Sequence, residues 1–334
     1  MQKIRYGIIG LGFFGEKHAE TLKNIPGVEL AALCTRRAER LKEMADMFKV
    51  PKTYRDYRDL LKDKDIDAVS IVTHINDHRD ITVAALQSGK HVFLEKPMAG
   101  MPEDCDAIID AAAKAKGVFM VGHICRFDPR VVLAKQAVAE GKIGKIVSMH
   151  STRNLPAFIG AGVLDKISPL MGDGIHDVDI MLWLTGDRIS SVYAQNVRVH
   201  DHKHPDIGWA MCRFAGGAIG VIETIWALPD NTPFSIDART EIVGDKGAIY
   251  IDCGNAGLAI NDSKGMHLPD TVYWPNLHGQ RAGVLKSELE YFIACVQSGK
   301  KPDIITPAES RAAVAAMCAA EKSAESGKVI SLQE

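Results

Sequence analysis

A short apolar segment near the start of the chain, residues 6–9, runs directly into three glycines, Gly10, Gly12 and Gly15. This G-x-G-x-x-G pattern between a strand and a helix is the dinucleotide-binding fingerprint. The first glycine permits a tight turn, the second lets the backbone approach a pyrophosphate, and the third lets the helix pack close to the strand. The helix N-terminus offers unpaired N–H groups to phosphates. The predicted cofactor-binding residues of this loop are Gly10, Gly12, Phe13, Phe14 and Gly15.

Strands and helices alternate through the first part of the chain. Such alternation predicts a parallel sheet with helices on both faces. We therefore expect a doubly wound α/β Rossmann domain over residues 1–124. Its predicted strands after the glycine loop are 28–34, 67–73, 90–94 and 118–122, and its predicted helices include 78–88 and 102–116.

The pattern changes after residue 124, where β-rich segments follow one another with hairpin-type turns at 216–217 and 244–247. This is typical of an open, mostly antiparallel sheet with helices on one side. We expect an α+β domain over residues 125–334 that binds substrate and forms oligomers, with the option that the last helix packs back on the Rossmann domain. The predicted strands are 145–154, 189–199, 208–214, 219–226, 236–243 and 248–252, and the predicted helices include 129–140, 174–184, 283–298 and 307–326.

Charge and cysteine content narrow the class of protein. The net charge of −2 over 334 residues gives no nucleic-acid footprint. No apolar run approaches the roughly 20 residues of a membrane span, and the first predicted strand leaves no room for a signal peptide. The seven cysteines form no C-x-x-C pair, which argues against a zinc site or a disulfide framework. We expect a cytoplasmic protein with free thiols and with neither a nucleic-acid nor a membrane partner.

The residues after strand 28–34 bear on the choice of cofactor. An NAD site usually carries an acidic residue there for the ribose hydroxyls, whereas this chain has Thr35, Arg36 and Arg37. A guanidinium suits a 2′-phosphate, so NADP is favoured over NAD. The alternative is that the arginines are solvated charges that open the next helix.

Glu95, Lys96 and Pro97 directly follow strand 90–94. Residues at the carboxyl ends of parallel strands face the crevice where ligands bind. A lysine there can reach a ligand, while Pro97 stiffens the backbone behind it and permits a cis peptide bond. The alternative is a solvated surface lysine.

Several motifs together resemble the Gfo/Idh/MocA oxidoreductases, the relatives of glucose–fructose oxidoreductase and inositol dehydrogenase. They are the glycine loop, Thr73 and His78, G-K-H-V-F-L-E-K-P at 89–97, G-I-H-D-V-D at 174–179 and the closing segment 323–329. The resemblance covers essentially the whole chain. It implies hydride transfer between a nicotinamide cofactor and a hydroxyl or keto carbon of a sugar, cyclitol or sugar derivative. It also implies a homodimer or homotetramer formed through the C-terminal sheet.

The resemblance implies residue roles as well. Thr73, His78, Glu95 and Lys96 would bind the cofactor, Lys96 would also contact the substrate hydroxyl, and His176 would be the catalytic acid/base. The chemistry fits, because an imidazole titrating near neutrality can take the hydroxyl proton while a hydride leaves the carbon. A nearby ammonium stabilises the developing alkoxide. On a helix His176, Asp179 and Trp183 share a face; the alternative is a helix-surface histidine.

The chain departs from the family pattern at one position. The family commonly has an Asp four residues before this histidine, where this chain has Gly172, with Asp173 one position later. Asp173 can serve as the N-cap of the helix that begins at Gly174, or it can take over the missing carboxylate's role of orienting His176 or binding a hydroxyl. The absence of an Asp at position 172 puts in question the proton transfer expected of His176, and with it the activity.

Other polar residues are candidates for binding a polyol. The full substrate-binding set is Lys96, Arg126, Arg153, Asn154, Asp173, His176 and Asp179, with Asp128, Trp274 and His278 as further candidates. The alternate histidines His200, His202 and His204 lie in a sequence that is typical of a loop, and no distant ligand completes a set, so no metal is expected.

Two other functions remain open at this point. Some relatives oxidise a sugar transiently with tightly held NAD, cleave a glycosidic bond and reduce the product again. A non-catalytic sensor that binds NAD(P) is the other alternative, motivated by Gly172.

Overall fold

A computed structural model describes residues 3–254, 257–263 and 265–332. The chain divides into two compact units: the first consists of Met1–Phe127 with Val272–Arg311, and the second of Asp128–Thr271 with Ala312–Glu334. The sequence pattern predicts a single domain boundary, after residue 124. In the structure the late segment Val272–Arg311 groups with the first unit.

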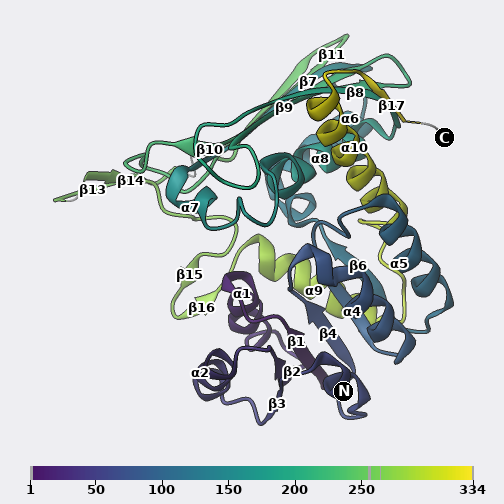
Figure 1. Ribbon diagram of the computed structural model, residues 1–334, viewed down its shortest axis with the longest axis vertical. Helices are drawn as coiled ribbons and strands as arrows, with labels where there is room; N and C mark the ends of the chain where they lie inside the picture. Colours follow the sequence, from purple (N-terminus) through teal and green to yellow (C-terminus); the bar gives the residue numbers. More distant parts are fainter. Residues whose placement is uncertain (1–2, 255–256, 264, 333–334) are drawn as a thin grey trace. The chain divides into compact units, whose positions relative to one another are not determined.

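The described residues of the first unit form a six-stranded parallel sheet in the order β3-β2-β1-β4-β5-β6. From β1 the chain adds strands β2 and β3 on one side of β1, and it then adds β4, β5 and β6 on the other side. Because the crossover connections are right-handed, the helices of the first half cover one face of the sheet and those of the second half cover the other. The doubly wound fold is confirmed (Figure 1). Its elements are β1 Ile4–Ile9, α1 Phe13–Leu22, β2 Val28–Cys34, α2 Ala38–Phe48, β3 Lys52–Tyr54, α3 Tyr57–Lys62, β4 Ala68–Ile71, α4 Ile75–Gln87, β5 His91–Glu95, α5 Pro102–Lys114, β6 Phe119–Gly122, a 3-10 turn Ile124–Phe127, the small hairpin β15 Asn276–Leu277 and β16 Gln280–Arg281, and α9 Val284–Ser298.

The described residues of the second unit form a seven-stranded sheet in the order β12-β11-β7-β10-β9-β8-β17. β7 and β10 run parallel, and the other neighbouring described strands are antiparallel. The expected open, mostly antiparallel sheet is therefore confirmed, with one parallel pair. The elements are α6 Pro129–Ala139, β7 Ile146–Pro156, α7 Ala157–Ala161, a π-helical turn Leu170–Gly174, α8 Ile175–Thr185, β8 Ile189–Val197, β9 Ile207–Phe214, β10 Ile219–Leu228, β11 Asp237–Gly244, β12 Ala248–Asp252, β13 Ile260–Asp262, β14 Gly265–His267 and β17 Ile330–Ser331. Helix α10, Pro307–Ser326, has residues in both units.

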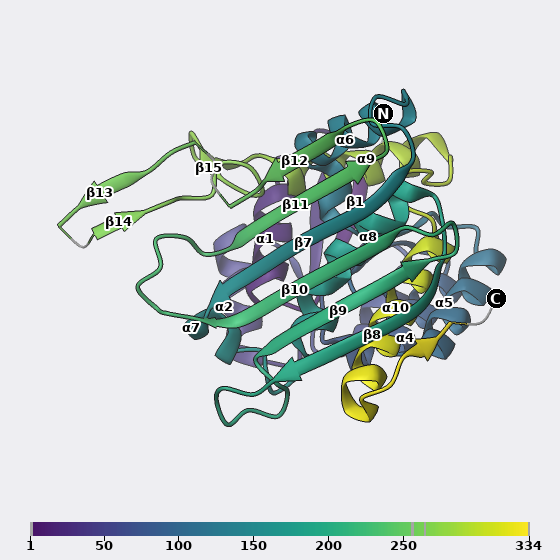
Figure 2. The same cartoon turned by 90° about the horizontal axis from the view of Figure 1, so that it is seen from above.

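Side chains alternate between buried and exposed along β9 and β11. This period of two gives the sheet one core face and one exposed face. Helix α8 lies against the core face, where it contacts β7 and β10, and Figure 2 shows the opposite face of the sheet without a helix over it. The hydrophobic core of the second unit therefore lies between α8 and the strands β7 and β10.

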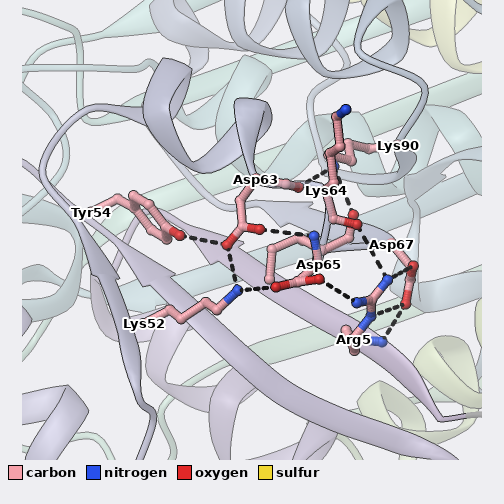
Figure 3. Close-up of polar contacts among 9 residues, drawn as sticks. Arg5, Lys52, Tyr54, Asp63, Lys64, Asp65, Asp67 and Lys90 are labelled. Atoms are coloured by element: carbon pink, nitrogen blue, oxygen red, sulfur yellow. Dashed lines mark hydrogen bonds and ion pairs between the residues drawn. The ribbon is translucent and has the colours of Figure 1, made fainter.

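A network of polar side chains ties together the strand ends of the first unit that lie opposite the glycine loop (Figure 3). Asp63 Oδ2 accepts hydrogen bonds from Lys52 Nζ at 2.8 Å and from Tyr54 Oη at 2.6 Å. Arg5 donates to both oxygens of Asp67. These residues lie at or near the amino ends of β1, β3 and β4, so we assign the network to stability of the sheet.

The helices in the described ranges include none that is both long enough and apolar enough to span a membrane.

Candidate functional site

The glycine loop has the geometry that a dinucleotide requires. Gly10 has a φ of +99°, and a Cβ there would lie 2.1 Å from the carbonyl oxygen of Val72. A Cβ on Gly15 would lie 2.1 Å from the carbonyl oxygen of Gly10. Both positions therefore exclude any larger residue. A Cβ on Gly12 would meet no described atom within 4 Å, so the backbone at this position is open to a ligand.

The start of α1 supports the same assignment. Gly12 is the N-cap of α1 and supplies no side-chain hydrogen bond to the first turn, so the N–H groups there suit a phosphate. Phe13 is 68% exposed beside the loop. Phe14 packs edge-to-face against Trp274, with 5.4 Å between the ring centroids. The loop and the first turn of α1 thus fit the pyrophosphate of a dinucleotide.

The arginines after β2 lie at the same edge of the sheet. The Arg37 guanidinium donates to the carbonyl of Leu11, within the glycine loop, at 2.7 Å. The Arg36 side chain is 82% exposed and pairs with Asp77 at 3.0 Å. Thr35 directly follows β2. These positions leave the Arg36 guanidinium accessible from solvent.

The buried His78 contacts the backbone on both sides of the turn around Lys96. His78 places Nδ1 2.8 Å from the carbonyl oxygen of Pro97 and Nε2 3.2 Å from that of Thr73. Burial lowers the pKa of His78, while the carbonyl groups of Pro97 and Thr73 act in the opposite direction. The Lys96–Pro97 peptide bond is cis, as the sequence allowed. His78 therefore binds the backbone behind the lysine.

A chain of buried polar groups leads away from Glu95. Oε1 of Glu95 lies 2.9 Å from His18 Nε2, and His18 Nδ1 lies 3.2 Å from Ser70 Oγ. Ser70 Oγ lies 3.0 Å from the hydroxyl of Tyr6, whose pKa is raised by burial. The chain joins α1, β4 and β1 to the residue that precedes Lys96. Sequence reasoning missed His18, Ser70 and Tyr6; the signal was a polar residue inside an otherwise apolar strand and a histidine three positions after Gly15.

The helix that carries His176 begins differently from the expectation. A π-helical turn, Leu170–Gly174, precedes α8. The N-cap residue Gly174 has helical dihedrals, and no side chain caps the helix there. Asp173 is therefore not the N-cap: its Oδ2 accepts a hydrogen bond from Trp226 Nε1 at 2.8 Å. The N-cap alternative was wrong because the helical backbone already continues through residue 173; the other role of Asp173 stays a prediction.

His176 and Asp179 are 7% and 1% exposed, respectively. This burial removes the alternative of a solvated histidine on the helix surface. The next residue along the helix, Asp177, makes two hydrogen bonds with the Arg153 guanidinium, at 2.9 and 3.0 Å. Arg153 thus attaches β7 to α8 beside His176.

Other predicted substrate residues have protein partners too. Asn154 Oδ1 accepts from the N–H of Ile225 at 2.9 Å, and its Nδ2 donates to Glu223 at 2.7 Å. Arg126 is buried and donates to the carbonyl of Ile304 at 2.7 Å and to Glu309 at 3.1 Å.

The remaining candidates have local roles. Asp128 caps α6 by accepting from the N–H of Arg130 at 2.9 Å. His200 pairs with Asp206 at 2.8 Å, and among the described residues no three His, Cys, Asp or Glu side chains group as metal ligands. His278 has a left-handed backbone conformation, with a φ of 53°. The predicted site residues thus fall into two sets, one on each unit. The cofactor residues lie on the first unit with Arg126, and the others lie on the second, except Trp274 and His278, which belong to the first.

Comparison with known proteins gives concordant matches to both halves. Residues 4–123 match a family model described as "Oxidoreductase family, NAD-binding Rossmann fold", and residues 131–250 match the "GFO/IDH/MocA C-terminal domain". A myo-inositol 2-dehydrogenase of Thermotoga maritima is 32% identical over 99% of both chains. A scyllo-inositol 2-dehydrogenase (NAD(+)) of Bacillus subtilis is 28% identical over 99% of this chain and 96% of the relative. The crystal structure of a myo-inositol 2-dehydrogenase from Lactobacillus plantarum superposes with a TM-score of 0.87, at 25% identity over 99% of this chain and all of the other.

Proposed function

Because the chain belongs to the Gfo/Idh/MocA family of oxidoreductases, we propose that it oxidises a hydroxyl carbon of a cyclitol, or reduces the corresponding ketone, with a nicotinamide cofactor. One observation carries the proposal: similarity to a myo-inositol 2-dehydrogenase extends over 99% of both chains. The dinucleotide loop, the E-K-P turn and a buried His176 accompany it.

The residues have distinct roles in the proposed reaction. A bound nicotinamide supplies the hydride acceptor. His176 takes the proton of the substrate hydroxyl at a ring nitrogen as the hydride leaves the carbon, and it returns the proton in the reverse direction. The ammonium of Lys96 stabilises the negative charge that develops on the substrate oxygen. Arg153, Asn154, Asp173 and Asp179 are proposed to orient the polyol, and Arg126 stands with them as the candidate on the first unit.

We also propose that NADP(H) binds more tightly than NAD(H). Arg36, with an exposed guanidinium, and Arg37 follow β2, and the segment 35–37 holds no acidic residue. A guanidinium can make charge-assisted hydrogen bonds to a 2′-phosphate. The proposal concerns the preference alone, since the NAD-binding fold itself is shared by the family.

The exposed face of the C-terminal sheet supports a homodimer or homotetramer. Trp209, Met211 and Tyr250 are 40%, 47% and 73% exposed on the strands of this sheet. Large apolar side chains exposed on a sheet face favour pairing of that face with another surface. Light scattering after chromatography measures the oligomeric state; Met211→Glu should dissociate the assembly, and an unchanged mass would contradict the assignment to this face.

The cysteines support residence in the cytoplasm. All seven lie in the described ranges, and the structure places none of them in a disulfide bond, which is typical of proteins in a reducing compartment. Mass spectrometry of unreduced, alkylated native protein should find seven alkyl groups, and a missing pair would contradict this proposal.

A turnover screen tests the proposed reaction. Purified protein is incubated with NAD⁺ or NADP⁺ and with myo-inositol, scyllo-inositol and monosaccharides, and the reduced cofactor is followed by absorbance. Net formation of reduced cofactor with a cyclitol is expected. Cleavage of a glycoside with no net reduced cofactor would instead support the transient-oxidation mechanism. Cofactor binding without turnover of any polyol would support a sensor.

A further inference from the structure

The indole of Trp226 occupies the space beside Gly172. Trp226 lies near the end of β10 and is 3% exposed. A Cβ on Gly172 would lie 2.7 Å from Cη2 and 3.0 Å from Cζ2 of this indole. Both distances are shorter than ordinary carbon–carbon contact. Position 172 therefore has no room for a side chain while the indole is in place.

The same indole holds the neighbouring carboxylate. Trp226 Nε1 donates to Asp173 Oδ2 at 2.8 Å. Asp173 precedes His176 by three residues on a continuous helical segment, and residues three apart are neighbours on a helix surface. The indole N–H of Trp226 thus fixes the direction of a carboxylate that lies three residues before the candidate acid/base.

Surrounding backbone holds the tryptophan in this position. The backbone N–H of Trp226 donates to the carbonyl of Asp206 at 2.8 Å. A Cβ on Gly160 would lie 2.7 Å from the Trp226 Cβ, so α7 approaches the strand at a glycine. The indole has little freedom to move away from Gly172.

Trp226 also forms part of the wall of a pocket of about 180 Å³ in the second unit. The pocket is lined by residues of α7 and of the loop between β8 and β9, among them Phe158, His200 and His202. One indole therefore contacts both the Gly172 position and this pocket. Shortening the side chain would enlarge this pocket toward Gly172.

Resting on the proposed function, we propose that Trp226 is a positioning and specificity-determining residue of the substrate site. Its N–H orients the Asp173 carboxylate, which serves in place of the family's carboxylate at position 172. Its ring excludes a side chain at 172 and closes the site toward the pocket of Phe158, His200 and His202.

The steric part is tested by melting temperatures, with no need for turnover. Gly172→Ala should lower the melting temperature in the wild-type background, because the added methyl group meets the indole. The same substitution should cost much less in the Trp226→Ala background. Equal effects in the two backgrounds would overturn the proposal. Because this arm uses the protein without substrate, it gives a result even if the wild type oxidises no polyol, which would overturn the proposed function alone.

The positioning part is tested by kinetics with Trp226→Phe, which keeps a ring and removes the N–H donor. We expect kcat for the best cyclitol to fall by about 10- to 100-fold, because the Asp173 carboxylate loses the donor that orients it. The Kd for the cofactor should not change. Asp173→Asn combined with Trp226→Phe should be no slower than the slower single variant, because both act through one hydrogen bond. Asp201→Asn, in the exposed loop after β8, is the matched control. Multiplicative defects, or native kcat in Trp226→Phe, would overturn the positioning role.

The specificity part predicts a gain of function. Trp226→Ala should raise kcat/KM for cyclitols with a bulky O-substituent relative to myo-inositol, because the pocket becomes continuous with the substrate site. Gly172→Asp should raise kcat for myo-inositol in the Trp226→Ala background and lower it in the wild type. An unchanged substrate ratio in a folded Trp226→Ala variant would show that the indole sets no substrate boundary. If that variant does not fold, Trp226→Leu is used for the same ratio.

Discussion

His18 Nε2 and Glu95 Oε1 lie 2.9 Å apart, and both side chains are buried. One residue lies on the helix that follows the glycine loop, and the other immediately precedes Lys96. This contact connects the predicted phosphate-binding helix with the turn that carries the predicted catalytic lysine. It is a link within the first unit that the linear motifs alone do not contain.

The contact between His18 and Glu95 is expected to stabilise the folded protein. His18→Phe keeps a ring of similar size but leaves the buried Glu95 carboxylate and Ser70 without the imidazole. We expect a loss of at least about 2 kcal/mol in the free energy of unfolding, because an unsatisfied buried acceptor costs more than a lost exposed contact. Denaturant titration followed by circular dichroism measures it. The control is His267→Phe at an exposed position on β14; equal midpoints for the two variants would contradict the structural role of His18.

Lys96 and His176 are predicted to act as one catalytic unit. His176→Ala should lower kcat by about 10²- to 10⁴-fold while the Kd of the cofactor stays close to native. Lys96→Met should also lower kcat, because it removes the charge that stabilises the alkoxide. The double variant should be far less impaired than the product of both defects. Oxidation by the wild type should be faster at higher pH than at lower pH, because the base must be unprotonated to take the hydroxyl proton. A near-native kcat in His176→Ala would falsify the assignment, and Asp173 or Asp179 would be tested next.

The cofactor preference is predicted to depend on Arg36. Each charge-assisted contact to a 2′-phosphate should contribute about 1.5–3 kcal/mol, so Arg36→Ala should weaken NADPH binding by tenfold or more and leave NADH binding nearly unchanged. Fluorescence titration gives both dissociation constants. Arg58→Ala, an exposed arginine on α3, is the control. Tighter binding of NADH than of NADPH by the wild type refutes the preference, and an unchanged ratio in Arg36→Ala refutes the role of that side chain.

Acid should weaken the network of Figure 3 through Asp63. Hydrogen bonds from Lys52 and Tyr54 hold the pKa of this carboxyl well below its ordinary value. A carboxyl with a lower pKa in the folded state stabilises the fold above its unfolded pKa of about 4, and the contribution is lost as the pH falls. Asp63→Asn should therefore melt below the wild type at neutral pH, with the difference shrinking under acid conditions. Melting temperatures of both proteins, measured at a series of pH values from 7 downward, test this. The control is Asp46→Asn, at an exposed position of α2, which should show no such trend.

Local sequence was enough to predict the parallel sheet of the first unit and its glycine loop. The glycine pattern spans only the six residues from Gly10 to Gly15. The structure shows why glycine is required at both ends: a Cβ atom there would collide with a backbone oxygen. Alternating strands and helices likewise predicted the parallel sheet, because burial on both faces requires continuous apolar strands. The β-rich segments with hairpin-type turns after residue 124 likewise predicted the open, mostly antiparallel sheet of the second unit.

Contacts between distant residues could not be predicted from the sequence. Trp226 lies 54 positions after Gly172, so only the register of β10 against its neighbours and against the helical segment brings the indole to that glycine. The same holds for His18 and Glu95. The sequence offered Asp173 two roles, and one of them, the helix cap, follows from a local rule. The tertiary structure decided otherwise, since the π-helical turn satisfied the backbone there and a tryptophan from a strand supplied the hydrogen-bond donor. The sequence by itself determined which segments are strands, helices and phosphate-binding turns, because these follow from interactions within a few residues. The tertiary structure decided which polar side chains meet, because that depends on the packing of elements far apart in the chain.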